Sequence, residues 1–570
     1  MNRPTPAIVS QSAARRLPRL ALILFCVAYV LPGFLGRAPW KNADVGAFGA
    51  MAELAQGGNW WSPSVLGLPV DDPALLPYWL GAIFVRGLPF VPPDLAARLP
   101  FALLLALTLS CTWYAVYHLA RQPAAQPVMF AFGGEARPAD YARALADAGL
   151  LALVACLGLA QLSHETTPDV TRLAAVSAML LGAARLAKPG PNAHGRGLGW
   201  WAGGWLALAL SGSAWLGLVL GAGWLTLLWL TQRQHTRDED GEAPARGVLA
   251  IATVAALLLT LGSAWAGALA WPDFAALRAN LRWESWGRLL LWFTWPAWPL
   301  VLWTLWRWRR QRRQPHVALP MWAVTVVVVS SALADERDRA LLLALPALAA
   351  LAAFALPTLR RSVSALIDWF TLLFFSFCAL VIWVIWFAMM TGVPAKPAAN
   401  VAKLAPGFVP EFSFFLFALG AAATLAWLWL VSWRVGRHRD AIWKSLVLPA
   451  AGSTLCWLLL MTLWLPLLDF GRSYEPISRR IASLVPPLDC VLVDGLSQAQ
   501  IAALRHHGGL RLVRTGTTDG EATCASLLVT PQGQASLHER VDLTQWAYTA
   551  GVRRLNDSKE SLLLYQRVGR

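Results

Sequence analysis

The sequence predicts an α-helical membrane protein of about thirteen spanning helices, with a small α/β domain at its C-terminus. Three observations lead to this fold class. Of 570 residues, 57% are apolar and 14% are charged, and the mean hydropathy is +0.49. Apolar segments long enough to cross a bilayer recur from residue 20 to residue 468. Beyond residue 468 these segments stop, and the pattern becomes that of a soluble domain.

The predicted spans are separated by basic or Pro/Gly-rich breaks. They lie at about residues 20–36, 97–118, 144–162, 170–184, 198–211, 214–231, 247–270, 289–306, 318–334, 340–357, 364–390, 412–432 and 445–468. The first has a signal peptide as its alternative, although residues 32–37 offer no good small-residue cleavage site. Residues 76–90 are short and interrupted by Arg86 and prolines, so we expect an interfacial helix within a long first loop, residues 37–96.

Charge predicts the orientation of the chain. Loops on the N-terminal side hold more than twice as many Lys and Arg residues as the opposite loops, the C-terminal segment excluded. By the positive-inside rule the N-terminus is cytoplasmic, and an odd number of spans puts the C-terminus outside. We therefore expect a bacterial inner-membrane protein with a cytoplasmic N-terminus (1–19), a transmembrane domain (20–468) and a periplasmic domain (469–570).

The net charge of +16 does not indicate nucleic-acid binding, because the basic residues are scattered between apolar segments rather than gathered on one soluble face. The densest run, five arginines within 307–313, is most simply a cytoplasmic stop signal. Binding of anionic lipid is its alternative.

The C-terminal segment reads as a small α/β domain. Strands are expected at residues 490–493, 510–513, 526–529 and 561–565, with a helix over 497–507. Cys490 and Cys524 each border a predicted strand, and such a pair can form a disulfide in an oxidising periplasm. The sequence does not give the distance between them.

Charged side chains beside membrane spans are costly and suggest function. The first loop carries Asp44 and Asp72, and the next outer loop carries Asp169. Later outer loops carry three arginines, Arg282, Arg337 and Arg339. Arginine can hold a phosphate in a bidentate fork, and a carboxylate can activate an acceptor. The outer side is therefore expected to act on a lipid-linked phosphate, and the alternative for each residue is a solvated loop charge.

A set of residues in the outer loops follows a known pattern. It comprises Asp44, Gly58-Asn59-Trp60, Pro63, Gly67, Pro69, Asp72-Pro73-Ala74, Tyr78-Trp79, Ala96-Ala97-Arg98-Leu99-Pro100, Thr167-Pro168-Asp169, Asn280-x-Arg282 and residues 335–346. With these residues the chain resembles the protein O-mannosyltransferase superfamily, and within it the bacterial lipid A aminoarabinose transferases. The resemblance extends over most of the chain.

The resemblance implies a C-type glycosyltransferase that moves a sugar from a polyprenyl-phosphate donor to a lipid A-like, glycan or protein acceptor at the periplasmic face, with inversion at the anomeric carbon. Asp44 would then lie near the acceptor nucleophile. Asp169 would support that site or help to bind a divalent metal as cofactor. Substrate would contact further residues of the pattern, namely Asp72, Tyr78, Trp79, Arg282, Arg337 and Arg339.

The chain departs from the family pattern at two positions and also lacks the Tyr expected shortly after the basic residues. The Glu expected after the catalytic Asp is Val45, and the loop Lys thought to touch phosphate is Pro73. These departures leave an alternative open, a non-catalytic relative that binds a polyprenyl lipid or a partner protein in envelope glycan assembly.

Overall fold

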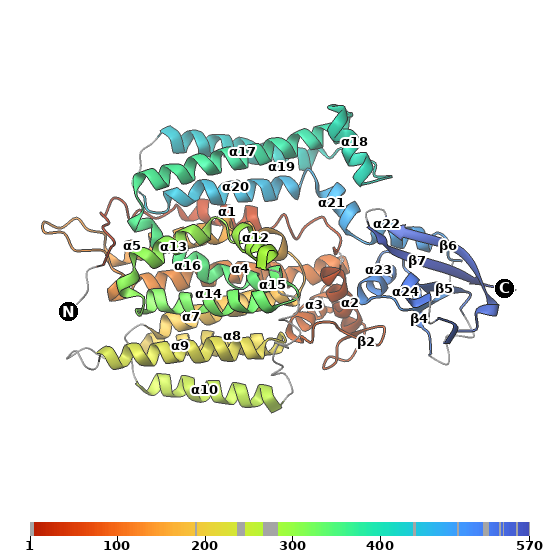
Figure 1. Cartoon of the computed structure of the whole chain (residues 1–570), viewed down its shortest axis with the longest axis horizontal. Helices are drawn as coiled ribbons and strands as arrows, with labels where there is room; N and C mark the ends of the chain where they lie inside the picture. Colours follow the sequence, from red (N-terminus) through yellow and green to blue (C-terminus); the bar gives the residue numbers. More distant parts are fainter. Residues whose placement is uncertain are drawn as a thin grey trace.

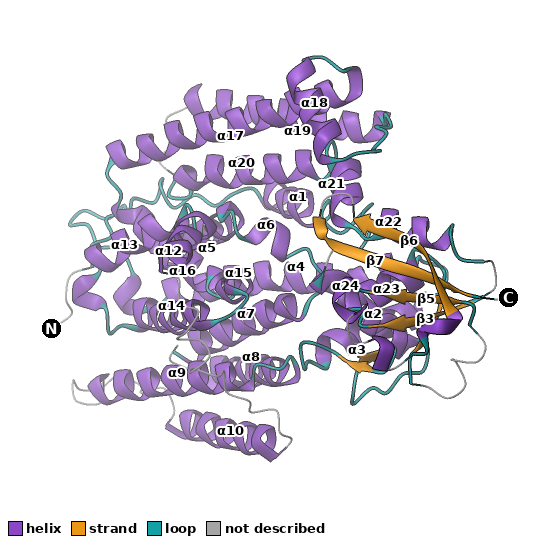
Figure 2. Ribbon diagram, turned by 45° about the vertical axis from the view of Figure 1, so that its right-hand side comes forward, coloured by secondary structure: helices purple, strands orange, loops and turns teal. Residues whose placement is uncertain are grey.

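The computed structural model describes residues 5–40, 42–187, 191–235, 246–265, 283–436, 441–486, 489–516, 524–534, 537–539, 541–554 and 557–568. A bundle of helices carries a small sheet domain at one end, and the N-terminus lies at the other (Figure 1). Figure 2 shows the strands of this sheet gathered at one side of the molecule, with short helices beside them. The predicted fold class, a mostly helical membrane protein with a C-terminal α/β domain, is confirmed.

Six helices of the described chain are long and apolar enough to cross a membrane. They are α4 (Pro93–Ala120), α9 (Ala214–His235), α10 (Arg246–Trp265), α14 (Pro315–Leu333), α17 (Arg361–Thr391) and α19 (Phe414–Gly436). Two bent pairs raise the number to eight if each is one span. The first is α12 (Trp283–Phe293) with α13 (Ala297–Arg307), bent by 88°, and the second is α20 (Lys444–Leu460) with α21 (Leu465–Arg472), bent by 69°.

The expected number of thirteen spans is therefore not confirmed. The remaining apolar segments form helices that are not both long enough and apolar enough to be counted as spans, namely α1 (Arg19–Val30), α5 (Pro138–Ala155), α6 (Leu159–Leu162), α7 (Pro168–Leu186), α8 (Pro191–Leu210), α15 (Arg337–Leu342) and α16 (Leu345–Ala355). The apolar composition of a sequence segment does not reveal where a helix is interrupted, as it is between α15 and α16. Nor does it distinguish lipid from a protein interior, and α7 is buried along nearly its whole length.

Close packing of α7 against α8 explains that burial. A Cβ atom added at Gly182 would lie 2.5 Å from the backbone nitrogen of Trp201, and one at Gly204 would lie 2.7 Å from the carbonyl oxygen of Ala175. Small residues let two helix backbones approach in this way. The pair forms a rigid base for the N-terminus of α7, where Asp169 lies.

The first loop is folded. It contains α2 (Ala43–Ala55), a hairpin of β1 (Ser64–Val65) and β2 (Leu68–Pro69), and α3 (Leu76–Gly87). The helix expected over residues 76–90 corresponds to α3. The helix α2, which contains Asp44 in its first turn, was not predicted. Its contacts with α3 and with the C-terminal domain place the loop between that domain and the bundle (Figure 1).

Helix α18 (Ala395–Leu404) joins α17 to α19, and α22 (Glu475–Ala482) is the first helix of the C-terminal domain. Its sheet has the order β4-β3-β5-β7-β6, with β4, β3 and β5 parallel and β7 and β6 antiparallel. The strands are β3 (Cys490–Asp494), β4 (Arg511–Arg514), β5 (Ser526–Val529), β6 (Trp546–Arg554) and β7 (Asp557–Arg567), with α23 (Gln498–His506) and α24 (Pro531–Gln534). All four predicted strands and the helix are present, and β6 is additional.

Helix α23 attaches this domain to the first loop. Ser497 caps the helix and forms a capping box with Gln500. A Cβ atom added at Gly49 of α2 would lie 2.4 Å from the Cβ of Ala502, so the two helices are in close contact. Arg505 of α23 forms an ion pair with Glu53 of α2 at 2.9 Å. The C-terminal domain is therefore held against α2 through α23.

Cys490 and Cys524 are joined by a disulfide that links β3 to the residue preceding β5 by two positions. The other five cysteines of the chain are free. We expect alkylation of the unreduced, denatured protein to label five thiols and alkylation after reduction to label seven, as counted by intact mass. Labelling of all seven without reductant would contradict the disulfide. In a Cys111→Ala control the two numbers should each fall by one.

Candidate active site

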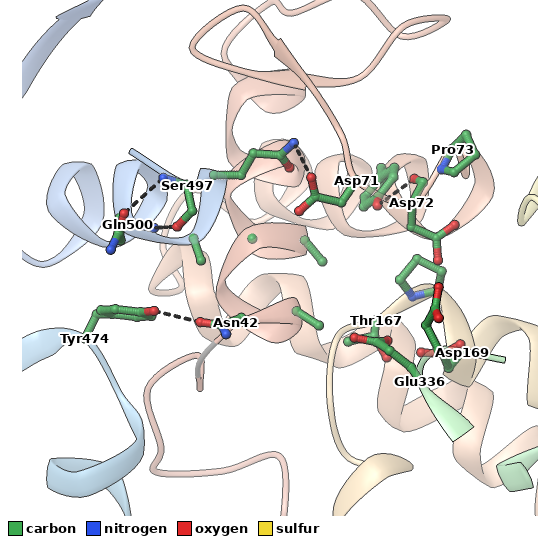
Figure 3. A pocket seen from close by; sticks show the side chains of 18 of the residues that line it. Asn42, Asp71, Asp72, Pro73, Thr167, Asp169, Glu336, Tyr474, Ser497 and Gln500 are labelled. Carbon is green, nitrogen blue, oxygen red and sulfur yellow. Dashed lines mark hydrogen bonds between the residues drawn. The ribbon is translucent and has the colours of Figure 1, made fainter. Parts of the chain in front are cut away.

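A cavity of about 1010 Å³ lies where the first loop, the N-terminus of α7 and the C-terminal domain meet. Figure 3 shows its polar lining. Asp72, Asp169 and Glu336 gather on one side, and Ser497 and Gln500 of α23 lie on the other. The cavity is thus built from segments more than 300 residues apart in the chain.

Asp72 and Tyr78 both line this cavity. The Tyr78 hydroxyl donates to the carbonyl oxygen of Asp72 at 3.1 Å. The Asp72 carboxylate forms an ion pair with Arg172 at 2.6 Å. Burial raises the pKa of Asp72, and Arg172 opposes that shift. The neighbouring Asp71 accepts a hydrogen bond from Gln498 at 3.2 Å, which ties the loop to α23.

Asp169 lies in the first turn of α7. It follows Pro168, the first residue of the helix, where a backbone N–H would have no partner within the helix and its absence therefore costs nothing. It forms ion pairs with Arg172 at 3.0 Å and with Arg339 at 3.2 Å. Arg339 also contacts Glu165 at 2.6 Å and Glu336 at 3.2 Å. Asp72, Arg172, Asp169, Arg339 and Glu165 therefore form one continuous ion-pair network.

Carboxylates outnumber guanidinium groups in this network. Four of them, Asp72, Asp169, Glu165 and Glu336, share Arg172 and Arg339. Burial alone would lower the pKa of Arg339, but the carboxylates raise it overall, Glu165 most strongly. Burial raises the pKa of Glu165 despite its contact with Arg339. The carboxylates in excess can accept hydrogen bonds from the hydroxyl groups of a ligand.

Asp44 lies beneath the cavity but does not line it, although Asn42, Ala43, Gly46 and Ala47 do. Its side chain is 1% exposed and forms an ion pair with Arg37 at 2.7 Å. It also accepts bonds from the Trp40 amide at 3.0 Å, from the Thr166 amide at 2.7 Å and from the Thr166 hydroxyl at 2.5 Å. Both carboxylate oxygens are therefore occupied by donors.

These donors keep Asp44 ionised. Burial by itself would raise the pKa of Asp44, but the charge of Arg37 and the bonds from Thr166 lower it to about 2. Arg37 also donates to the carbonyl oxygens of Gly33 at 2.9 Å and of His164 at 2.6 Å. The pair therefore joins the end of the first predicted span, α2 and the segment that leads into α7.

Two other predicted site residues, Arg337 and Trp79, do not line the cavity. Arg337 is within 3.4 Å of the Ser285 hydroxyl and does not line the cavity. The Trp79 indole donates to the carbonyl oxygen of Trp60 at 2.6 Å. Arg282 lies outside the described residues. Within the described part of the chain, no three His, Cys, Asp or Glu side chains are arranged to hold a metal ion.

Two arginines of the site, Arg37 and Arg172, were not singled out from the sequence. Arg172 lies inside the predicted span 170–184, and an arginine within a span is itself a sign of function. Arg37 immediately follows the first span. A charge at the boundary of an apolar segment is common for topological reasons, so position alone did not distinguish it.

Replacing Asp44 with Asn should destabilise the protein by about 3–5 kcal/mol, because it leaves the buried Arg37 without its counter-ion. Thermal unfolding in detergent measures this. Since the folded pKa of about 2 lies below the ordinary value of 3.8, Asp44 stabilises the fold above about pH 4. The difference between wild type and variant should therefore shrink as the pH falls from 4 towards 2.

The partly exposed pair Asp140–Arg143, 3.7 Å apart, supplies the control. Asp140→Asn should change stability by no more than about 1 kcal/mol. Equal losses in the two variants would show that the Arg37–Asp44 pair has no special structural role.

No protein-family model and no curated protein sequence matches the chain. The crystal structure of ArnT from Cupriavidus metallidurans in the apo state aligns with a TM-score of 0.59 and 17% identity, covering 96% of each chain. The structure of the same protein bound to undecaprenyl phosphate aligns with a TM-score of 0.61 and 15% identity, covering 97% of this chain and 98% of that one.

At these identities the likeness establishes the fold and nothing further. It spans nearly the whole of both chains, so it includes the helical bundle, the folded first loop and the C-terminal domain together. ArnT is a lipid A aminoarabinose transferase, and the resemblance seen in the sequence is confirmed at the level of fold. The chain has the fold of ArnT.

Proposed function

We propose that the chain is a membrane glycosyltransferase that moves a sugar from a polyprenyl-phosphate donor to an acceptor within the cavity between α2, α7 and the C-terminal domain. One observation carries the proposal. The fold is that of ArnT, which has been solved with undecaprenyl phosphate bound, and the likeness covers 97% of this chain.

The cavity supports this reading. Its volume of about 1010 Å³ is at the upper end of the range of about 300–1000 Å³ for small-molecule sites, which leaves room for a donor sugar and part of an acceptor. Its lining combines carboxylates of the first loop and α7 with amide and hydroxyl groups of α23. Such groups hydrogen-bond sugar hydroxyls, whereas an apolar cavity would not.

Arg172 is the guanidinium that lines the cavity in the described chain. Its partner Asp72 keeps a third of its side chain exposed, and burial raises the pKa of that carboxyl. An entering donor phosphate would take the place of Asp72 on Arg172, while Asp169 keeps the guanidinium oriented. Arg339 then acts through Asp169, which it holds at 3.2 Å.

Direct displacement at the anomeric carbon would form the bond to the acceptor oxygen and break the bond to the donor phosphate, which leaves as polyprenyl phosphate. The configuration of that carbon inverts. Asp169, which lines the cavity, would orient the acceptor. With a pKa of about 2 and no exposed oxygen, Asp44 positions the segment containing Thr166. A phosphate acceptor needs no deprotonation, so a strong base is not required.

The acceptor is proposed to be a lipid A-like lipid, a glycan or a protein. We propose that the cavity opens on the periplasmic side of the inner membrane. The support is the excess of Lys and Arg in the loops at the N-terminal side. Residues 469–570 would then form a periplasmic domain and residues 1–19 a cytoplasmic terminus.

A second candidate function is lipid or partner binding without catalysis. Val45 and Pro73 replace the acidic and basic residues of the family pattern, and Asp44 is fully engaged by structural contacts. The two candidates differ in what loss of the Asp169 charge should do.

Asp169→Asn should lower sugar transfer by about 100-fold or more, because a group that orients the reacting acceptor is lost. Envelope lipids, lipopolysaccharide and glycoproteins would be compared by mass spectrometry in a deletion strain carrying wild type or variant. Wild type should restore the glycan that the deletion removes, and Asp169→Asn should not. Protein abundance in the membrane fraction would be measured in parallel.

Glu284→Gln is the matched control, since Glu284 is a highly exposed carboxylate paired with Arg288. It should restore the glycan fully. Full restoration by Asp169→Asn would exclude the catalytic proposal and favour the binding function.

Alkaline phosphatase fused after Arg570 tests the orientation separately, because this enzyme folds only where disulfides form. We expect an active fusion, and an active fusion after residue 235 instead would reverse the proposed topology.

A further inference from the structure

A second cavity lies at the end of the bundle opposite the C-terminal domain. It occupies about 720 Å³ between the start of α17, the end of α19 and the start of α20. Figure 1 shows these three helices side by side, with the C-terminal domain beyond their other ends. None of its lining residues lines the candidate active site.

The charged residues of this cavity are mostly basic. Arg361, Arg434 and Lys444 line it, together with one carboxylate, Asp368, which pairs with Arg434. Lys444 is 9% exposed. The buried atoms Asp368 Oδ1 and Arg434 Nε have no hydrogen-bond partner among the residues described. Buried polar atoms without partners are expensive, so the cavity suits a ligand that accepts a hydrogen bond from Arg434 Nε and donates one to Asp368 Oδ1. The three basic groups against one carboxylate favour negative charge on that ligand.

Its walls are also open to lipid. Trp369 lines the cavity with 63% of its surface exposed, and Leu366, one turn earlier on α17, is 68% exposed. Large apolar side chains exposed on a membrane-spanning helix face acyl chains. A ligand with an anionic head and an apolar tail therefore fits both parts of the cavity.

A smaller neighbouring cavity has the same character. It occupies about 520 Å³, is lined by Arg15, Arg16 and several tryptophans, and shares Ala441 with the larger one. Because two adjacent cavities have basic linings, positive charge at this end of the bundle extends beyond the one ion pair between Asp368 and Arg434.

We propose that the cavity between α17, α19 and α20 binds the phosphate headgroup of an anionic phospholipid, with its acyl chains along α17. Basic pockets between transmembrane helices bind such headgroups. The site goes beyond the proposed glycosyl transfer, since it lies at the other end of the bundle. The Arg361 and Lys444 side chains supply charge to the phosphate. The Ser364 and Ser445 hydroxyls are hydrogen-bonded to each other at 2.5 Å, and the one that accepts in this pair can donate its own proton to the phosphate.

Native mass spectrometry of the full-length protein in detergent tests this site. Phosphatidylglycerol, cardiolipin, zwitterionic phosphatidylethanolamine and undecaprenyl phosphate would be titrated separately. Arg361→Gln should weaken binding of the two anionic phospholipids about fivefold, because one basic residue near anionic lipid contributes about 1 kcal/mol of binding free energy. The double variant Arg361→Gln with Lys444→Gln should weaken it about 25-fold. Phosphatidylethanolamine binding should not change.

Arg313→Gln is the control, because it removes one exposed arginine from a loop outside both cavities. It should leave lipid binding within twofold of wild type. Melting temperatures show which variants are folded, and the exposed Arg361 variant decides the outcome if the double variant unfolds.

Equal phospholipid binding by Arg361→Gln and wild type would overturn the proposal. So would an equal loss in Arg313→Gln, or a dependence on Arg361 seen with undecaprenyl phosphate alone. None of these readouts requires glycosyl transfer, so the site can fail while the proposed function stands.

Discussion

The buried ion pair between Arg37 and Asp44 is the contact on which the geometry of the site depends. Four donors converge on one carboxylate, and they come from the end of the first predicted span, the start of α2 and the segment before α7. A buried ion pair is not a strong source of stability in itself, but loss of one partner leaves an unpaired charge in the interior. The pair therefore fixes where α2 lies, and α2 in turn fixes where α23 and the C-terminal domain attach.

Above this pair, the ion-pair network of Asp72, Arg172, Asp169, Arg339 and Glu165 supplies the chemistry of the cavity. Each guanidinium is already shared between carboxylates, so a donor phosphate must compete with an existing partner. The partner at the cavity surface, Asp72, is more exposed than Asp169 and is therefore the easier to displace. Because a phosphate alone must displace Asp72, binding requires further contacts from the rest of the donor. This arrangement favours selectivity for the complete donor over high affinity for phosphate.

The sequence predicted the fold class, the helix at 76–90, four strands and α23, because each depends on local periodicity. It also named Asp72, Tyr78, Asp169 and Arg339, which the structure brings to the same region. It did not predict α2, whose position depends on contacts with distant segments. The number of spans was not confirmed either, since α7 is shielded by protein and several apolar segments are broken. Arg172 was missed because it lies inside an apolar segment, and its pairing with Asp72 spans 100 residues.

A cryo-electron microscopy map of the full-length protein with a non-hydrolysable undecaprenyl-phosphate sugar analogue tests the central claim most directly. The account predicts density for the sugar and phosphate in the cavity between α2, α7 and α23, with the phosphate on Arg172 and Asp72 displaced from it. Density for the analogue only elsewhere on the protein, with the Asp72–Arg172 pair intact, would contradict it.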